Sequence, residues 1–313
     1  MSKQQMSSDT GARHRLEQIK ELVVIAMFSD DVLLDRLVLK GGNAMNIVHH
    51  IGTRASRDID FSMKGDFAPS ELGDIKQRIG KTLKQTMSES NLEMFDFEML
   101  EVPEGLTPDL ADFWGGYSVE FKLIERDTSQ ALGGKLDDMR RQSLEIEPGG
   151  GRRFSIDISR HEYVTGKLAV DLAGYRIYVY SPAMIVCEKL RAICQQMREY
   201  SIVVKRNRAG SSRARDFLDV HSLVTQRSID LLATANWQLL EAVFQAKRVS
   251  FDLLKRISEY REFHAASFGA VLDTVKPGVK LESFDFYFDF VVELAANCVA
   301  RHNTGPRQRL EGT

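Results

Sequence analysis

The stretch LVLKGGNAMNIVHHIGTRASRDIDFS, residues 37–62, decides how this chain is expected to fold. Its apolar start stops at Gly41-Gly42, which predicts a strand, a tight turn and then a helix over residues 43–50. Residues 56–62 alternate between polar and apolar side chains, as a half-buried strand does. We therefore predict a strand–turn–helix–strand unit at the start of a mixed α/β fold.

Two carboxylates stand close together in the second predicted strand. Asp58 and Asp60 are expected on one face of it, while Ile59 points into the core. Adjacent carboxylates repel each other unless a cation lies between them. Mg²⁺ takes oxygen ligands and shares them with substrate phosphates, and two such ions can clamp the oxygens of a phosphoryl displacement. An ordinary surface strand can also carry this pair, so the pair alone leaves both interpretations open.

The glycine pair favours the first interpretation. Glycines let the backbone approach a ligand closely, and the amides of a following helix favour phosphate. A plain structural turn would use the same residues. However, a Gly-Gly loop, a short helix and a strand with Asp-x-Asp follow one another in the order typical of polymerase-β-type nucleotidyltransferases.

The rest of the chain indicates two domains. Strand-like alternation recurs at residues 117–123, 154–159 and 175–180, and Ser181-Pro182 then opens a region that is mostly helical in pattern. The expected fold is a polymerase-β-type mixed sheet followed by a helical domain. The predicted divisions are a disordered tail (1–15), an α/β nucleotidyltransferase domain (16–180), a helical domain that completes the active site (181–300) and a second disordered tail (301–313).

The composition indicates which class of protein this is and where in the cell it is expected. The chain has 313 residues, of which 43% are hydrophobic and 27% charged, as in ordinary globular proteins. Its net charge of −2 means that any nucleic-acid site must be a local basic patch. Three cysteines are too few for a disulfide framework. Without an apolar signal core or a membrane-length apolar run, we expect a cytoplasmic protein that binds no membrane.

Four segments resemble one known family. Residues 39–45 and 54–61 resemble the Lys-Gly-Gly-Thr-like loop and the Arg-x-Ser-x-Asp-Ile-Asp-Phe strand of the AbiEii/AbiGii toxin nucleotidyltransferases. Residues 188–192 resemble the family's Glu-Lys-Leu-x-Ala helix, and residues 213–220 its (Lys/Arg)-Asp-x-x-Asp-(Leu/Val) segment. One departure is Asn43, which stands where the family often has Thr or Ser; it can still cap the helix and contact phosphate.

The resemblance implies roles for the matched residues. Asp58 and Asp60 would bind Mg²⁺ or Mn²⁺, with a third carboxylate on a neighbouring strand. Asp157 is our choice for it, and Glu120 is the alternative. The NTP would be bound by the loop, by a strand hydroxyl and by a lysine of the helical domain: Lys40, Gly41, Gly42, Asn43, Ser56 and Lys189.

Lys189 and Asp216 are the catalytic residues expected from the helical domain. By resemblance, Lys189 contacts nucleotide phosphate and Asp216 orients it or aids the acceptor. The alternative for Lys189 is a surface lysine whose stem lies along the core while its ammonium reaches outward. The alternative for Asp216 is an ion pair with Arg213 one helical turn away.

A basic segment indicates what the acceptor is. Residues 202–212 are expected to form a mobile loop between Lys189 and Asp216, and a cluster of cations there could grip an RNA backbone. A solvated loop would have the same composition. The candidate RNA-binding residues are Lys205, Arg206, Arg208 and Arg213.

The resemblance implies a specific function. It implies a toxin of a toxin–antitoxin or phage-defence pair that transfers a nucleoside monophosphate from an NTP to an acceptor hydroxyl and releases pyrophosphate. RNA, in particular the 3′ end of tRNA, is the acceptor expected, and a cognate antitoxin is the expected protein partner. The alternatives are a nucleotidyltransferase acting on a protein or small molecule, and a pseudoenzyme that binds a nucleotide or a partner.

Overall fold

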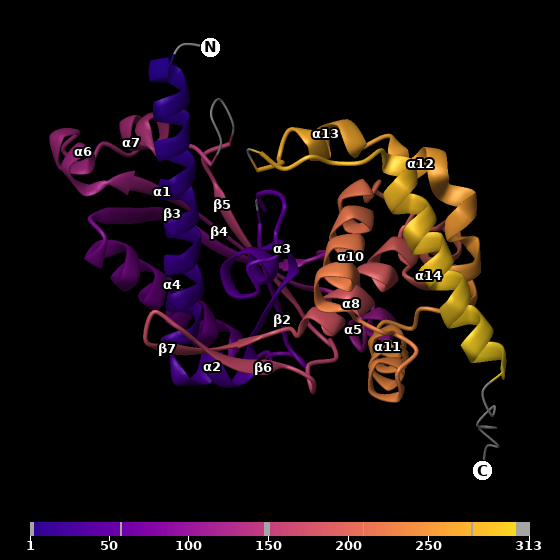
Figure 1. Ribbon diagram of the computed structural model, residues 1–313. Helices are drawn as coiled ribbons and strands as arrows, with labels where there is room; N and C mark the ends of the chain where they lie inside the picture. Colours follow the sequence, from indigo (N-terminus) through magenta and orange to yellow (C-terminus); the bar gives the residue numbers. More distant parts are fainter. Residues whose placement is uncertain (1–2, 57, 147–150, 209, 277, 305–313) are drawn as a thin grey trace. The chain divides into compact units, whose positions relative to one another are not determined.

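The structure is a computed structural model of the chain that describes residues 3–56, 58–146, 151–208, 210–276 and 278–304 (Figure 1). The chain divides into two compact units. Unit 1 comprises Met1–His50 and Ser56–Tyr180, and unit 2 comprises Ile51–Ala55 and Ser181–Thr313. The chain therefore leaves unit 1 after His50, gives five residues to unit 2, and returns at Ser56.

Unit 1 is built on a seven-stranded mixed sheet of order β3-β4-β5-β2-β1-β7-β6. β2 runs parallel to β5, and β1 runs parallel to β7, whereas the other neighbours are antiparallel. The mixed α/β fold class is as predicted. The strands are β1 (Val38–Lys40), β2 (Ile59–Ser62), β3 (Leu92–Val102), β4 (Gly116–Glu125), β5 (Phe154–Ser159), β6 (Leu168–Leu172) and β7 (Tyr175–Val179).

Two helices of unit 1, α1 (Lys3–Phe28) and α4 (Leu72–Glu89), pack on the sheet. The other helices of unit 1 are α2 (Asp31–Arg36), α3 (Gly41–Asn43), the π-helical turn η1 (Ala44–Val48), α5 (Pro108–Ala111), α6 (Arg126–Ala131) and α7 (Leu136–Gln142). α1 packs on α4 and on β7, and α4 packs on β3 (Figure 1). Phe28 of α1 meets Phe61 of β2 with ring centroids 5.6 Å apart. Since strand side chains alternate, Lys40 and Asp60 lie on the opposite face.

The predicted tails differ from the structure where it describes them. α1 begins at Lys3, so residues 3–15 continue the helix predicted from residue 16 instead of forming a tail. They contain no proline, the residue that most strongly stops a helix. At the other end α14 (Phe284–Thr304) runs past the predicted boundary at 300. Residues 1–2 and 305–313 lie outside the described residues.

Unit 2 is helical and is arranged around α8 (Pro182–Cys194). Ser181 caps α8 by accepting the Met184 N–H, with proline in the first turn as the sequence predicts. α8 packs against α10, α11 and η2, which explains why it is buried on nearly all sides. The other helices are α9 (Arg198–Val203), α10 (Ala214–Arg227), α11 (Thr234–Ala246), the 3₁₀ helix η2 (Phe251–Tyr260), α12 (Arg261–Ala265), α13 (Phe268–Leu272) and α14.

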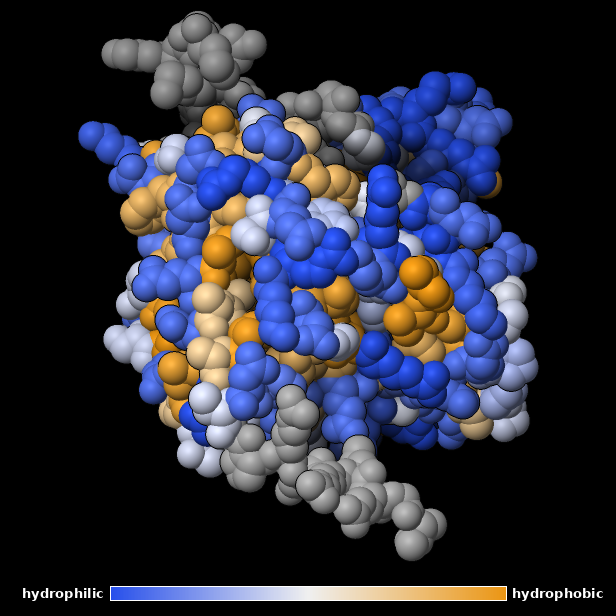
Figure 2. Space-filling view, turned by 90° about the vertical axis from the view of Figure 1, so that its right-hand side faces the viewer, coloured by the Kyte–Doolittle hydropathy of each residue, from blue (hydrophilic) through white to orange (hydrophobic). Residues whose placement is uncertain are grey.

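The face shown in Figure 2 carries several separate hydrophobic patches among hydrophilic side chains. Such a mixture is normal, because more than half of a folded protein's surface is apolar. Across the described residues, no helix is both long and apolar enough to span a bilayer.

Candidate active site

Three charged side chains form a row across the middle of the unit 1 sheet. Asp60 of β2 lies in register with Lys40 of β1 on one side and with Asp157 of β5 on the other. Residues in register on neighbouring strands present their side chains to the same face. The sheet thus brings the predicted Asp60 and Asp157 together on the face opposite α1.

Asp58 is held differently from the way its sequence parity suggests. β2 begins at Ile59, so Asp58 and Ser56 precede the strand and the alternation applies to Asp60 only. The carbonyl oxygen of Asp58 instead accepts two side-chain hydrogen bonds, from Asn43 Nδ2 at 2.6 Å and from Ser56 Oγ at 3.4 Å. The predicted loop and strand residues therefore meet at the Asp58 backbone.

The environment of Asp157 is that of a carboxylate near like charge. Burial raises the pKa of Asp157, and the charge of Asp58 raises it further. Glu120, the alternative third carboxylate, accepts a hydrogen bond from Arg153 Nη1 at 2.5 Å and pairs across the sheet with Ser155. The geometry therefore favours Asp157 over Glu120 as the companion of Asp58 and Asp60.

Two properties of Asp58, Asp60 and Asp157 favour a divalent cation: they are carboxylates, and their negative charges repel each other. Mg²⁺ and Mn²⁺ prefer carboxylate oxygens, and a cation would relieve the repulsion between Asp58 and Asp157. In the described part of the chain, no three His, Cys, Asp or Glu side chains are grouped closely enough to hold a metal ion. The metal site at Asp58, Asp60 and Asp157 therefore stays a prediction.

Gly41 lies directly against the carboxylate of Asp60. Its φ of +66° belongs to the left-handed region that side chains disfavour, and a Cβ built on it would lie 2.3 Å from Asp60 Oδ2. The turn can therefore approach the acidic row this closely only with glycine at position 41.

We expect Gly41→Ala to displace the Asp60 carboxylate and to lower nucleotidyl transfer by roughly tenfold or more, because a small misplacement in a site is costly. Steady-state kinetics would measure it. Gly133→Ala is the matched control, since Gly133 also has a positive φ, +60°, but nothing lies within 4 Å of its added Cβ. Equal losses in the two variants would show that backbone strain, and not the contact with Asp60, limits activity.

Lys40 and Asn43 are both predicted to bind nucleotide, and both are buried. Lys40 belongs to the charged row, and Asn43 lies next to Asp58. The Lys40 ammonium donates to Ser159 Oγ at 3.0 Å and lies 3.7 Å from Glu162 Oε1. Asn43 Nδ2 donates a hydrogen bond to the carbonyl oxygen of Asp58. The buried Oδ1 of Asn43 has no hydrogen-bond partner among the described residues. In this structure both side chains thus shape the surroundings of the acidic residues.

Unit 2 contains a buried chain of five alternating charges. Lys189 Nζ on α8 donates to Asp216 Oδ1 at 2.9 Å and to Asp219 Oδ2 at 2.8 Å, both on α10. Asp216 also accepts a hydrogen bond from Arg213 Nε, and Asp219 from Arg54. Arg54, Lys189 and Arg213 thus alternate with Asp219 and Asp216 along this chain of charges.

The partners in this network fix its protonation. Burial alone would raise the pKa of Asp216 and Asp219, but the charges of Arg213 and Lys189 around the first, and of Arg54 and Lys189 around the second, hold each pKa below its usual range. Burial alone would lower the pKa of Lys189, and the two aspartates outweigh it and raise that pKa. All three groups are therefore charged at neutral pH.

The alternative for Lys189 was a surface lysine whose ammonium reaches outward into solvent. The structure does not have Lys189 in that position. It is only 4% exposed, and its ammonium lies between two carboxylates. Asp216 satisfies both expectations for it, since it contacts Lys189 and pairs with Arg213. The sequence therefore indicated the contacts of Asp216 with Lys189 and Arg213 but not the burial of Lys189.

Sequence reasoning missed two members of the network. Asp219 follows Asp216 by three residues, a spacing that places both on one face of α10 and could have indicated its role. Arg54 lies 165 residues from Asp219 in the chain. Its partner could not be inferred from any local pattern.

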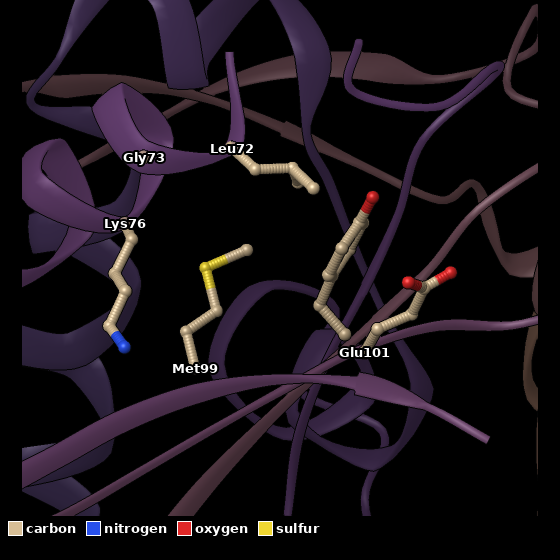
Figure 3. A pocket seen from close by; sticks show the side chains of 6 residues that line it. Leu72, Gly73, Lys76, Met99 and Glu101 are labelled. Carbon is tan, nitrogen blue, oxygen red and sulfur yellow. The ribbon is translucent and has the colours of Figure 1, made fainter. Parts of the chain in front are cut away.

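A pocket of about 210 Å³ opens between α4 and the β3–β4 hairpin (Figure 3). It is lined by Leu72, Gly73, Lys76, Met99, Glu101 and Tyr117. None of these residues is a predicted site residue, so this pocket is separate from the acidic row.

The mixed sheet of unit 1 agrees with the fold class predicted for a nucleotidyltransferase. A family model for the nucleotidyl transferase AbiEii toxin of type IV toxin–antitoxin systems matches residues 23–290. The chain belongs to this family and is a nucleotidyltransferase, which confirms the resemblance seen in its motifs. None of the curated proteins compared matches the chain.

Solved structures resemble the chain only distantly. A chain from H. pylori described as a nucleotidyltransferase is 14% identical, with a TM-score of 0.46 and coverage of 96% of this chain and 99% of that one. JHP933 from Helicobacter pylori is 14% identical, with a TM-score of 0.44 and coverage of 97% and 96%. An antigenic nucleotidyltransferase-like protein from Paracoccidioides brasiliensis is 13% identical, with a TM-score of 0.33 and coverage of 83% and 94%. At these values the family assignment rests on the family match alone.

Proposed function

We propose that the protein transfers a nucleoside monophosphate from an NTP to an RNA hydroxyl in a reaction that depends on Mg²⁺. The observation that carries the proposal is the row of Lys40, Asp60 and Asp157 across the sheet, with Asp58 beside it. The family supports a toxin acting within a toxin–antitoxin pair. A cognate antitoxin and defence against phage belong to the proposal, as does the 3′ end of tRNA as the acceptor.

The unit 1 residues would bind and position the reacting groups. Asp58, Asp60 and Asp157 would hold Mg²⁺, which when bound supplies positive charge to the phosphates and the attacking oxygen. Gly41 lets the loop lie directly against the Asp60 carboxylate. Catalysis would consist mainly of positioning and charge neutralisation, as in phosphoryl transfer generally.

The unit 2 network would supply a cation for the triphosphate. Lys189 is the cation of this network that is shared between its two carboxylates, and a buried cation interacts strongly with a nearby anion. Lys189 carries three N–H donors and spends two of them on Asp216 and Asp219. The third remains for a phosphate oxygen.

Several contacts join described parts of the basic segment, predicted as a mobile loop, to the end of α8 and to α9. Its first residues end α9, and Gly210 packs so closely that an added Cβ would lie 2.2 Å from Gln196 O. Arg206 Nη2 donates to Gln195 O at 2.9 Å and to Ser201 Oγ at 3.0 Å. Arg206 therefore holds the segment together instead of facing a ligand.

Two of the other candidate RNA-binding residues are better placed to contact an RNA backbone. Lys205 and Arg208 are exposed, whereas Arg213 is committed to Asp216. Exposed cations close together in sequence are what neutralisation of an RNA backbone requires. The acceptor contact is therefore assigned to Lys205 and Arg208.

We expect Lys205→Ala/Arg208→Ala to weaken RNA binding and to lower the slope of log affinity against log salt by about two, roughly one per lost phosphate contact. Titration of total RNA or tRNA at several salt concentrations would measure it. Lys255→Ala/Arg256→Ala is the control, because it removes the same two charges from η2, outside the basic segment. Equal slopes for the first variant and the wild type would remove the segment from the acceptor site.

The reaction itself is tested by incubating the protein with labelled NTPs, Mg²⁺ and cell lysate, and by asking which fraction carries the label. Label in RNA of tRNA size is the expected result. Label in protein or in a small molecule would replace RNA as the acceptor. No transfer of label to any fraction, with NTP still bound, would indicate a nucleotide-binding protein without activity.

A further inference from the structure

Arg54 grips Asp219 with the geometry of a strong ion pair. Its Nη2 lies 2.7 Å from Asp219 Oδ2 and its Nε 3.2 Å from Asp219 Oδ1. The two side chains are 9% and 2% exposed. Such two-point pairing fixes the plane of a carboxylate as well as its position.

The carboxylate fixed in this way is a direct partner of Lys189. Asp219 Oδ2 accepts from both Arg54 Nη2 and Lys189 Nζ. The direction of the remaining Lys189 N–H bond depends on where its two carboxylate partners lie. Asp216 is fixed from the other side by Arg213, so each partner of Lys189 has its own arginine.

Arg54 is itself held by backbone pairing within unit 2. Its segment bonds to residues near the end of α13, through Ala55 N–H to Thr274 O at 2.9 Å and Lys276 N–H to Thr53 O at 3.0 Å. Arg54 also forms a β-bridge with Val275. A side chain that starts from a paired backbone can impose its position on Asp219.

We propose that Arg54 is a positioning residue that acts through Asp219 to aim the ammonium of Lys189 at the nucleotide phosphates. The inference rests on the proposed role of Lys189 in binding the triphosphate. Without Arg54, Asp219 can turn toward Lys189 alone and draw its ammonium away from the direction that phosphate requires. Arg54 touches no substrate in this account, and its effect exists only while Lys189 is present.

A double-mutant cycle on nucleotide affinity tests this dependence. The variants are Arg54→Gln, Lys189→Met and the double variant, with the affinity for each of the four NTPs and Mg²⁺ measured by calorimetry. We expect Arg54→Gln to weaken binding roughly tenfold in the wild-type background and less than about twofold in the Lys189→Met background, as coupled residues in one network do. Arg54→Lys should restore only part of the affinity, because it keeps the charge and loses the two-point grip.

Arg261→Gln is the matched control. Arg261 also pairs with two aspartates of unit 2, Asp285 and Asp289, but at the surface, so its loss should leave affinity unchanged. Equal weakening by Arg54→Gln in both backgrounds would overturn the inference and leave the role of Lys189 intact. Unchanged affinity in Lys189→Met would refute the proposed function of Lys189 instead. If Arg54→Gln does not fold, Asp219→Asn takes its place in the same cycle, with the same two outcomes.

Discussion

Asp60→Asn is expected to lower nucleotidyl transfer by at least about a thousandfold while the protein stays folded, because the substitution removes a negative charge from the proposed metal site and keeps its shape. Asp60 occupies the centre of the charged row, between Lys40 and Asp157 and against Gly41. Steady-state transfer to RNA with Mg²⁺, together with thermal unfolding, would measure both parts of the expectation. Asp58→Asn should have an effect of similar size.

Metal binding separates this explanation from a general effect of losing a carboxylate. Asp60→Asn should also weaken the binding of Mn²⁺, followed by calorimetry or by its paramagnetic effect on water. Asp74→Asn is the control, since Asp74 forms an exposed ion pair with Arg78 on α4 and should alter neither activity nor metal affinity. Wild-type activity in purified Asp60→Asn would show that the acidic row is not the catalytic centre.

The sequence predicted this row because its signals are local. The apolar run and the alternation around Asp60 follow the period of a strand, and the structure has β1, the short helices α3 and η1, and then β2 at these places. The choice of Asp157 required knowing which strands are neighbours. Alternation indicates a strand but does not reveal its neighbour, and only the sheet order places β5 beside β2.

Features that depend on tertiary contacts could not be predicted. Asp58 precedes β2, and its carbonyl oxygen accepts a hydrogen bond from Asn43, a contact that no local pattern indicates. The helical stripe of α8 predicted Lys189 at an edge, but the helix is surrounded by three others and has no exposed edge there. Arg54 matches a family motif, yet its partner lies on a distant helix.

Charge balance explains why these buried groups occur together. Each carboxylate of the unit 2 network has two cationic partners, and Lys189 is shared between the two carboxylates. Removing a cation and removing an anion should therefore have opposite consequences. Without Lys189 two positive and two negative charges remain, whereas without Asp216 three positive charges face one negative charge.

Lys189→Met is therefore expected to fold and to lose function. Methionine keeps most of the apolar stem, and the remaining charges balance, so thermal stability should change little. Transfer should fall by roughly a hundredfold or more, the scale observed when charge stabilisation is removed from an active site. Lys189→Arg should recover only part of the activity, because the guanidinium differs in shape from the ammonium that fits between two carboxylates.

Asp216→Ala gives the opposite pattern and completes the test. It leaves Lys189 and Arg213 buried or half-buried without their shared partner, so the free energy of unfolding should fall by about 3–5 kcal/mol. Loss of activity in that variant would follow from unfolding, and urea titration would show it. A stable Asp216→Ala together with an unfolded Lys189→Met would contradict the charge balance on which both expectations rest. Normal kinetics in a folded Lys189→Met would remove the lysine from the reaction, and its two bonds to Asp216 and Asp219 would then serve only to join α8 to α10.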